Sequence, residues 1–425
     1  MRTPRSASSA PTRWKSCSAL IISRSPAPWR RVGQFVPASV SSGGRAGPRT
    51  LAPVSEHAIA ARVESLLSRC RSAPVTVAGW RRLEPYAIAR ARLEDDERVI
   101  VKWMRPHPGA VRLAASQRLR TEVAALRFLS DDLESGLAPR VIAADLDAEL
   151  VVLEDLAPRT ALDGLLRAQG ATAHAERLVA FARVRGELSA ATAGRAGLYG
   201  VRRRALGPAR DAERLAGFRE EGRRQAALLG APIEGGAERE LAAALEELEH
   251  PGPFLALSNG DPEANNVLVH TDGDPDARLI DFEFAGCTHA LHDAVCLHVP
   301  GPGWLSVDAA HAEHHRRALA AGVPEAEDDR RYGFGLAAAC FSYVLIRLER
   351  AAKVGTRPPG DGSRVQLVAT LEAAARTAEE HRSLPRLAGW ARRVAGLLRR
   401  RWPDADVDLD DRTAFPPYTP RHRCS

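Results

Sequence analysis

Residues 257–283 constrain the fold of this chain more than any other stretch. They contain two short apolar runs, 267–269 and 279–280, separated by an eight-residue segment, 270–277, that is rich in Asp, Gly and Pro. Short apolar runs on either side of turn-forming residues are typical of two paired strands. The sequence therefore predicts a β-hairpin here.

The predicted hairpin has polar side chains at its open end. It would bring Asn266, at the entry to the first strand, close to Asp281, at the exit of the second, with Asp261 on the loop just before. An amide and a carboxylate oxygen side by side suit Mg²⁺, which prefers hard ligands and keeps water or phosphate in its other positions. A carboxylate five residues upstream of Asn266 could orient an attacking hydroxyl and accept its proton. This is the layout that phosphoryl transfer needs.

The pattern Asp261-x-x-x-x-Asn266, followed by Ile280-Asp281-Phe282-Glu283, resembles the core of the aminoglycoside phosphotransferase and choline kinase-like family, small-molecule relatives of the protein kinases. The resemblance implies an α+β, two-lobed protein-kinase-like fold with a small antiparallel-sheet N-lobe and a larger, mostly helical C-lobe. It also implies Asp261 as catalytic base, with Asn266 and Asp281 as Mg²⁺ ligands. The family usually has His where this chain has Asn259.

Lysine is rare in this chain, which makes each lysine informative. Of 60 basic residues only three are Lys, so 57 are Arg. Lys102 lies in a strand-like run, 98–103, where an unpaired ammonium would be costly. The helix expected at 111–128 contains one acid, Glu122. A Lys102–Glu122 ion pair that positions the nucleotide phosphates is the kinase arrangement; a solvated Lys and a surface Glu are the alternative.

The rest of the expected N-lobe comprises an amphipathic helix at 55–70 and strands at 75–80 and 86–93. The turn at 79–86 would cover the ATP phosphates, although it has a single Gly where such loops usually have several. Arg81 and Arg82 could contact phosphate there or simply be exposed. The residues around Glu154 and Leu156 resemble the family's hinge between lobes, where the backbone would hydrogen-bond the adenine edge.

Composition divides the chain into four parts. We expect a disordered basic arm at 1–50, an N-terminal lobe at 51–156, a C-terminal lobe at 157–402 and a loose tail at 403–425. The arm has nine basic residues and no acid, so the net charge of +7 leaves the rest at −2. The arm could be a disordered tail, the product of an upstream start codon, a transit peptide, or a segment that binds nucleic acid or an anionic membrane.

The remaining composition points to a protein of the cytoplasm. The six Cys are scattered without a CxxC pair, which is typical of free thiols in a reducing compartment. No run approaches the roughly 18 apolar residues needed to span a membrane. Cys and His alternate over 287–298, but their spacing is a poor match to zinc ligands. We expect a helix there instead, with Asp293 bracing the loop that contains Asp261.

The sequence therefore predicts an ATP- and Mg²⁺-dependent kinase acting on a hydroxyl group of a small molecule, such as an aminoglycoside, a choline-like compound or another polar metabolite. A non-catalytic nucleotide-binding module of the pseudokinase kind is the alternative. Acidic side chains near the acceptor would favour cationic amines, and aromatic rings could enclose a quaternary ammonium. The acidic candidates are Glu263, Glu283 and the cluster 325–329, all of which could instead be solvated surface. The aromatic candidates are Trp304, Tyr332 and Phe341.

Overall fold

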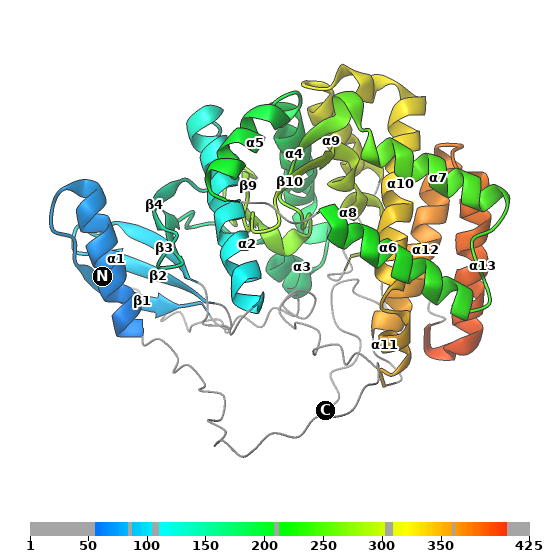
Figure 1. Ribbon diagram of the computed structural model, residues 1–425, viewed down its shortest axis with the longest axis horizontal. Helices are drawn as coiled ribbons and strands as arrows, with labels where there is room; N and C mark the ends of the chain where they lie inside the picture. Colours follow the sequence, from blue (N-terminus) through cyan, green and yellow to red (C-terminus); the bar gives the residue numbers. More distant parts are fainter. Residues whose placement is uncertain are drawn as a thin grey trace, which may run out of the picture.

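The protein has two parts of unequal size, a small sheet-containing lobe and a larger helical lobe (Figure 1). This computed structural model describes residues 56–83, 87–103, 110–207, 212–301, 309–358 and 362–405. The expected two-lobed α+β fold of the protein-kinase kind is confirmed. None of the helices in these ranges combines the length and apolar character needed to cross a membrane.

The N-lobe is built on a five-stranded antiparallel sheet with the order β1-β2-β3-β5-β4. The three strands and two helices expected before residue 130 are all present, with ends shifted by one or two residues. The elements are α1 (Glu56–Arg71), β1 (Val77–Arg82), β2 (Ile88–Leu93), β3 (Arg98–Trp103), α2 (Ala110–Arg127), the π-helical turn η2 (Phe128–Asp132), β4 (Val141–Asp145) and β5 (Leu150–Glu154).

Alternation along β3 explains where its lysine points. Successive strand side chains face opposite sides of a sheet. Val99 and Val101 are fully buried in the cluster that also contains the apolar face of α1. Ile100 packs against the other cluster, which contains α2. Lys102 shares the face of Ile100, so its side chain extends toward α2.

The C-lobe begins with the short strand β6 and ends with a short helical turn after α13. Its first half comprises β6 (Thr160–Ala161), α3 (Leu162–Gln169), η3 (Thr172–His174), α4 (Ala175–Thr192), α5 (Ala196–Ala205), α6 (Ala212–Leu228), α7 (Gly236–Glu249), η4 (Gly252–Phe254) and β7 (Leu255–Ser258). The second half comprises η5 (Ala264–Asn266), β8 (Val267–Val269), β9 (Ala277–Leu279), β10 (Gly286–His289), η6 (Ala290–His292), α8 (Val295–His298), α9 (Ala309–Ala320), η7 (Pro324–Glu327), α10 (Asp329–Leu348), α11 (Ala351–Gly355), α12 (Gly362–Glu380), α13 (Pro385–Arg401) and η8 (Pro403–Ala405).

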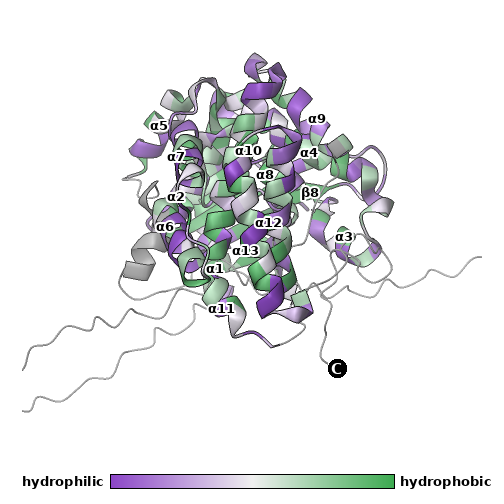
Figure 2. Cartoon of the chain, turned by 90° about the vertical axis from the view of Figure 1, so that its right-hand side faces the viewer, coloured by the Kyte–Doolittle hydropathy of each residue, from purple (hydrophilic) through white to green (hydrophobic). Residues whose placement is uncertain are grey.

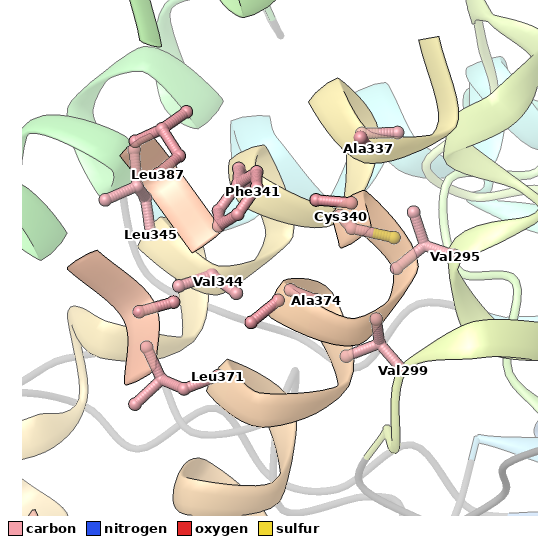
Figure 3. Close-up of a cluster of buried hydrophobic side chains, with 14 of the residues drawn as sticks. Val295, Val299, Ala337, Cys340, Phe341, Val344, Leu345, Leu371, Ala374 and Leu387 are labelled. Atoms are coloured by element: carbon pink, nitrogen blue, oxygen red, sulfur yellow. The ribbon is translucent and has the colours of Figure 1, made fainter. Parts of the chain in front are cut away.

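Helix α10 is the centre of the C-lobe core, as its apolar composition on all sides predicts. Thirteen of its residues are buried, and its N-terminus is capped by Asp328, which accepts from the backbone N–H groups of Arg330 and Arg331. Its side chains interlock with those of α8, α12 and α13 (Figure 3). In an end-on view, hydrophobic residues gather among α10, α12 and α13, and hydrophilic residues lie toward the rim (Figure 2).

The predicted hairpin is confirmed. Strands β8 and β9 pair antiparallel, with Val267 opposite Leu279, and the backbone N–H of Ile280 donates to the carbonyl of Asn266 at 3.0 Å. Because Asp281 follows Ile280 directly, this bond fixes Asn266 and Asp281 at the same end of the hairpin. The fold thus puts both residues beside the sheet lobe.

Candidate active site

Lys102 is the point at which the two lobes meet. Its Nζ lies 2.7 Å from Glu122 Oε2 on α2 and 2.7 Å from Asp281 Oδ1 after β9, and Glu283 Oε2 is 3.9 Å away. The Lys102 side chain is 13% exposed and that of Glu122 is 2% exposed. The structure therefore contains the predicted Lys102–Glu122 ion pair. It also brings Lys102 into contact with Asp281, at the exit of the hairpin and 179 residues away in sequence.

Burial and charge oppose each other in this cluster. Burial raises the pKa of Glu122 to about 7, with Asp281 and Glu283 adding to the rise and the Lys102 ammonium opposing it. The three carboxylates outweigh the burial of Lys102 and hold its pKa well above its usual value. Lys102 therefore stays protonated.

The loop that contains Asp261 (residues 259–266, called here the Asp261 loop) is fixed by its backbone. The Asn266 side-chain amide donates to the carbonyl of Asp261 at 3.0 Å. Gly260 has a φ of +79°, and a Cβ there would lie 2.2 Å from the carbonyl oxygen of Phe284. Only glycine meets both conditions. Burial raises the pKa of Asp261 to about 6, and the nearby Asp281 carboxylate adds to the rise.

Asn259, where the family usually has His, is held from both sides. Its Oδ1 accepts from Arg185 of α4 at 2.8 Å, and its Nδ2 donates to the carbonyl of Ile280 at 3.1 Å. It therefore ties the Asp261 loop to the hairpin end that precedes Asp281. Arg185 is completely buried and also lies 3.8 Å from Asp293.

Asp293 braces the same loop, as expected. It accepts a hydrogen bond from the hydroxyl of Ser258, and that hydroxyl accepts in turn from the backbone N–H of Gly260 at 2.9 Å. Arg185 and Asp293 thus hold the two ends of the turn before Asp261. The order of this turn does not depend on a histidine.

Asn266 and Asp281 form a donor set that suits Mg²⁺. Asp281 is a non-glycine residue with a φ of +60°, a conformation uncommon outside Asn, Asp and Gly and often found at functional sites. One of its carboxylate oxygens contacts Lys102, which leaves the other for a metal. The side-chain oxygen of Asn266 accepts from Asn265 at 2.9 Å and has a second lone pair. Two hard oxygen ligands are the usual protein share of a Mg²⁺ site that also takes phosphate.

This site lies within a region that matches a known family. The model of the phosphotransferase enzyme family matches residues 89–334, more than half of the chain, and this range contains Lys102, Asp261, Asn266 and Asp281. The chain belongs to the phosphotransferase enzyme family. The resemblance read from the hairpin motif is thereby confirmed.

Several solved structures resemble this phosphotransferase. A choline/ethanolamine kinase family protein from Mesorhizobium loti is 18% identical (74% of this chain and 93% of that one covered, TM-score 0.44). A putative fructosamine-3-kinase from Thermobifida fusca is 20% identical (76% and 100% covered, TM-score 0.44). The macrolide 2'-phosphotransferase from Brachybacterium faecium is 17% identical (74% and 97% covered, TM-score 0.42). No curated protein sequence matches the chain.

The segments expected from sequence to contact the nucleotide are the link after β5 and the turn after β1; β5 lies between β3 and β4 in the sheet. The backbone N–H of Glu154 donates to the carbonyl of Arg140 at 3.0 Å, so this N–H is already engaged. Leu156 follows in the link between the lobes and is buried. Of the turn 79–86, Gly79 to Arg82 belong to β1, and residues 84–86 lie outside the described residues. Arg82 lies over the Trp103 ring, 5.9 Å from its centroid.

Of the three acidic candidates for acceptor recognition, Glu263 and Glu283 lie near Asp261, and the Glu283 carboxylate contributes to the raised pKa of Asp261. Glu283 lies among the nucleotide-side groups, 3.9 Å from both Lys102 and Arg118. In the cluster 325–329, Asp328 caps α10 and Asp329 pairs with Arg316 at 2.7 Å. Glu263 is on the Asp261 loop itself. Burial raises its pKa to about 8, and the Asp261 carboxylate adds to the rise.

The aromatic candidates form no cage among the described residues. Phe341 is 1% exposed and packs in the α10 core (Figure 3). Tyr332 is buried, and Arg316 lies over its ring at 4.7 Å from the centroid. Trp304 lies outside the described residues. Neither described ring is open to a quaternary ammonium, because one is enclosed by aliphatic side chains and the other already carries a cation.

Arg185 and Arg118 were missed by the sequence reasoning. Arg185 holds the Asp261 loop, and Arg118 lies over the Phe284 ring at 4.8 Å. Both are among 57 arginines, so their residue type gave no signal. A buried position on α4 could have been found from helical periodicity, but the partner of a buried arginine could not.

Proposed function

We propose that this phosphotransferase uses ATP and Mg²⁺ to phosphorylate a hydroxyl group of a small molecule. The observation that carries the proposal is the position of Lys102 Nζ, 2.7 Å from carboxylates of both Glu122 and Asp281. This contact joins a strand of the small lobe to the end of the hairpin in the large lobe. It supports a nucleotide phosphate site between them.

Each site residue has a distinct task in this proposal. Glu122 holds the ammonium of Lys102 in place to contact the nucleotide phosphates. Asn266 and Asp281 would hold Mg²⁺, which when bound neutralises charge on the transferred phosphoryl group. Asp261 orients the acceptor hydroxyl and takes its proton, and the raised pKa of about 6 leaves it a stronger base than an exposed aspartate.

We also propose that the link after β5 receives the adenine. Because the Glu154 N–H is engaged by Arg140, the Leu156 N–H is the donor expected to face the base. This narrows the expectation from sequence, which named the backbone of both residues without distinguishing their roles.

The experiment is ATP turnover across a panel of hydroxylated small molecules, read as ADP release and as mass of the product. Asp261→Asn should lower kcat by about 10²-fold or more, because proton acceptance is lost, while Mg-ATP still raises the melting temperature. Asp274→Asn, in the exposed turn of the hairpin, is the matched control and should behave as wild type.

The same measurements separate the enzyme from the non-catalytic alternative. Mg-ATP binding without turnover on any acceptor, unchanged by Asp261→Asn, would favour a nucleotide-binding module. Absence of any thermal shift with Mg-ATP would contradict both readings of the site.

A further inference from the structure

An arginine of β2 and the first residue after β5 form an ion pair within the small lobe. The Nη2 of Arg90 donates to Asp155 Oδ1 at 2.9 Å, and the Nε of Arg90 lies 2.7 Å from Asp155 Oδ2. The Asp155 side chain is 4% exposed and that of Arg90 is 26% exposed. A guanidinium that meets both oxygens of one carboxylate fixes its orientation as well as its distance. The position of Asp155 is therefore tied to β2.

The register of the sheet shows which face Arg90 occupies. Its neighbours Ala89 and Ala91 are buried in the cluster that contains the apolar face of α1. Arg90 lies opposite Ile100 of β3, so it shares the other face with Ile100 and Lys102. Because β3 lies between β2 and β5, the Arg90 side chain passes over β3 to reach the link after β5.

The Asp155 carboxylate also shapes the link itself. Its Oδ1 accepts from the backbone N–H of Ala157 at 3.1 Å, which closes an Asx-turn around Leu156. The carbonyl of Leu156 accepts from the N–H of Arg159 at 3.1 Å, whereas its own N–H has no acceptor within the described part of the chain. The same carboxylate oxygen contacts both Arg90 and Ala157, so the sheet and this turn are joined through one side chain.

A second anchor holds the beginning of the link from the β4 side. The N–H of Glu154 donates to the carbonyl of Arg140 at 3.0 Å, and the N–H of Arg140 donates to the Glu154 carboxylate at 3.2 Å. This anchor fixes the last residue of β5. The Arg90–Asp155 pair acts one residue later, on the turn that contains Leu156.

The two ends of the proposed nucleotide site lie along the same pair of strands. Lys102 lies opposite Val151, and Val99 lies opposite Glu154, the last residue before the link. Three strand residues span about 10 Å, so the link begins about that far from the level of Lys102. A nucleotide that contacts Lys102 with its phosphates and Leu156 with its base must match this spacing. Movement of the turn would change it.

We propose that Arg90 is a positioning residue of the nucleotide site. Through Asp155 it fixes the turn that contains Leu156 relative to Lys102, so that the base and the phosphates of one nucleotide are bound together. Loss of the pair therefore weakens binding of the base and leaves the phosphate end intact. This inference rests on the proposed function, because it takes the nucleotide to bind between Lys102 and Leu156.

The test compares Mg-ATP, which occupies both ends of the site, with Mg-tripolyphosphate, which occupies only the phosphate end. Isothermal titration calorimetry with the full chain gives the Kd of Mg-ATP, and competition against Mg-ATP gives that of Mg-tripolyphosphate. Asp155→Ala should weaken Mg-ATP binding about tenfold, as for the loss of a charge-assisted hydrogen-bond pair, and change tripolyphosphate binding less than about twofold. General damage to the fold would weaken both ligands by the same factor.

Further variants assign the effect to the pair. Arg90→Met should weaken Mg-ATP binding as Asp155→Ala does, and the double variant should be no weaker than Asp155→Ala, because the two residues act as one unit. Asp155→Asn should recover part of the loss, since its amide oxygen can still accept from Ala157. The matched control is Arg92→Met, on the same strand, which breaks an exposed pair with Asp96 and should leave the binding of both ligands unchanged.

Failure of this inference differs from failure of the proposed function. A wild type that does not bind Mg-ATP would contradict the proposed function and this inference with it. Mg-ATP binding that is unchanged in either Asp155→Ala or Arg90→Met, or that is weakened by the same factor as tripolyphosphate binding, would overturn this inference alone. A wild type from which tripolyphosphate cannot displace Mg-ATP would also overturn it, because the site would then have no separate phosphate end.

Discussion

Replacement of Lys102 by Met tests the contact between the lobes through its pH dependence. At 2.7 Å and an effective dielectric constant of about 20, Coulomb attraction to Glu122 is about 6 kcal/mol, but the variant does not lose this amount. Glu122 can take up a proton when the ammonium is gone, and this limits the loss in free energy of unfolding. The expected loss of stability therefore depends on how costly that proton is at the pH of measurement.

The linkage between proton binding and folding gives the sign and the size of this pH-dependent loss of stability. The folded-state pKa of Glu122 is raised, so its burial lowers stability increasingly as pH rises above the unfolded value of 4.5. In the wild type this decline stops at about pH 7, where Glu122 ionises beside Lys102. In Lys102→Met the pKa rises further, and the decline continues. Between pH 7 and 8.5, about 1.5 units at 1.36 kcal/mol each give an extra loss of about 2 kcal/mol.

The assay is urea unfolding of wild type, Lys102→Met and Lys102→Met/Glu122→Gln at pH 6 and 8.5. The extra loss of about 2 kcal/mol should appear in the single variant at pH 8.5 and be absent from the double variant, which has no titrating group at 122. Arg392→Met, which breaks an exposed pair with Glu379, should cost less than about 1 kcal/mol at both pH values. Equal destabilisation of Lys102→Met at pH 6 and 8.5 would refute the reasoning.

Three further outcomes are expected. Gly260→Ala should lower kcat, and should lower the free energy of unfolding by about 2 kcal/mol or more, because the new Cβ meets a backbone carbonyl. Its control is Gly230→Ala, at φ +82° with open space around it, which should cost about 1 kcal/mol and leave kcat unchanged. Equal effects of the two substitutions would exclude the clash as the cause. Arg185→Lys should lower kcat about tenfold with the KM for ATP unchanged, since one ammonium cannot replace the hydrogen bonds of the guanidinium to both Asn259 and the carbonyl of Glu263. A change in the KM for ATP alone would contradict this. Asp281→Asn should raise the Mg²⁺ concentration needed for half-maximal turnover about tenfold or more. The same half-maximal Mg²⁺ concentration in the variant and the wild type would count against Asp281 as a metal ligand.

The sequence predicted those parts of the fold and site that depend on local pattern or on a rare residue. The hairpin followed from two apolar runs and a turn-rich segment, and β3 was placed to the residue. Lys102 could be selected because the chain has three lysines, and Glu122 because its helix has one acid. In both cases the signal was scarcity, which narrows a partner search to one candidate.

Contacts between distant segments made of common residues could not be predicted. Arg185 and Arg347 act on the Asp261 loop from α4 and α10, and nothing in the sequence separates them from the other arginines. The aromatic candidates had the converse problem. Phe341 has the residue type of a cage, but its position on the buried side of α10 became evident only from packing. Residue type predicts chemistry, and long-range packing decides whether that chemistry is accessible.

The distribution of charge around Lys102 favours a divalent cation at this end of the site. Around Lys102, three carboxylates face two cations, since Arg118 lies 3.9 Å from Glu283, so the nucleotide end has a formal charge of −1 before Asp261 is counted. A divalent cation is the ligand that such a surplus favours, and Asp281 presents an oxygen to it. The surplus extends to the proposed base, because burial and then the Asp281 and Glu283 carboxylates raise the pKa of Asp261.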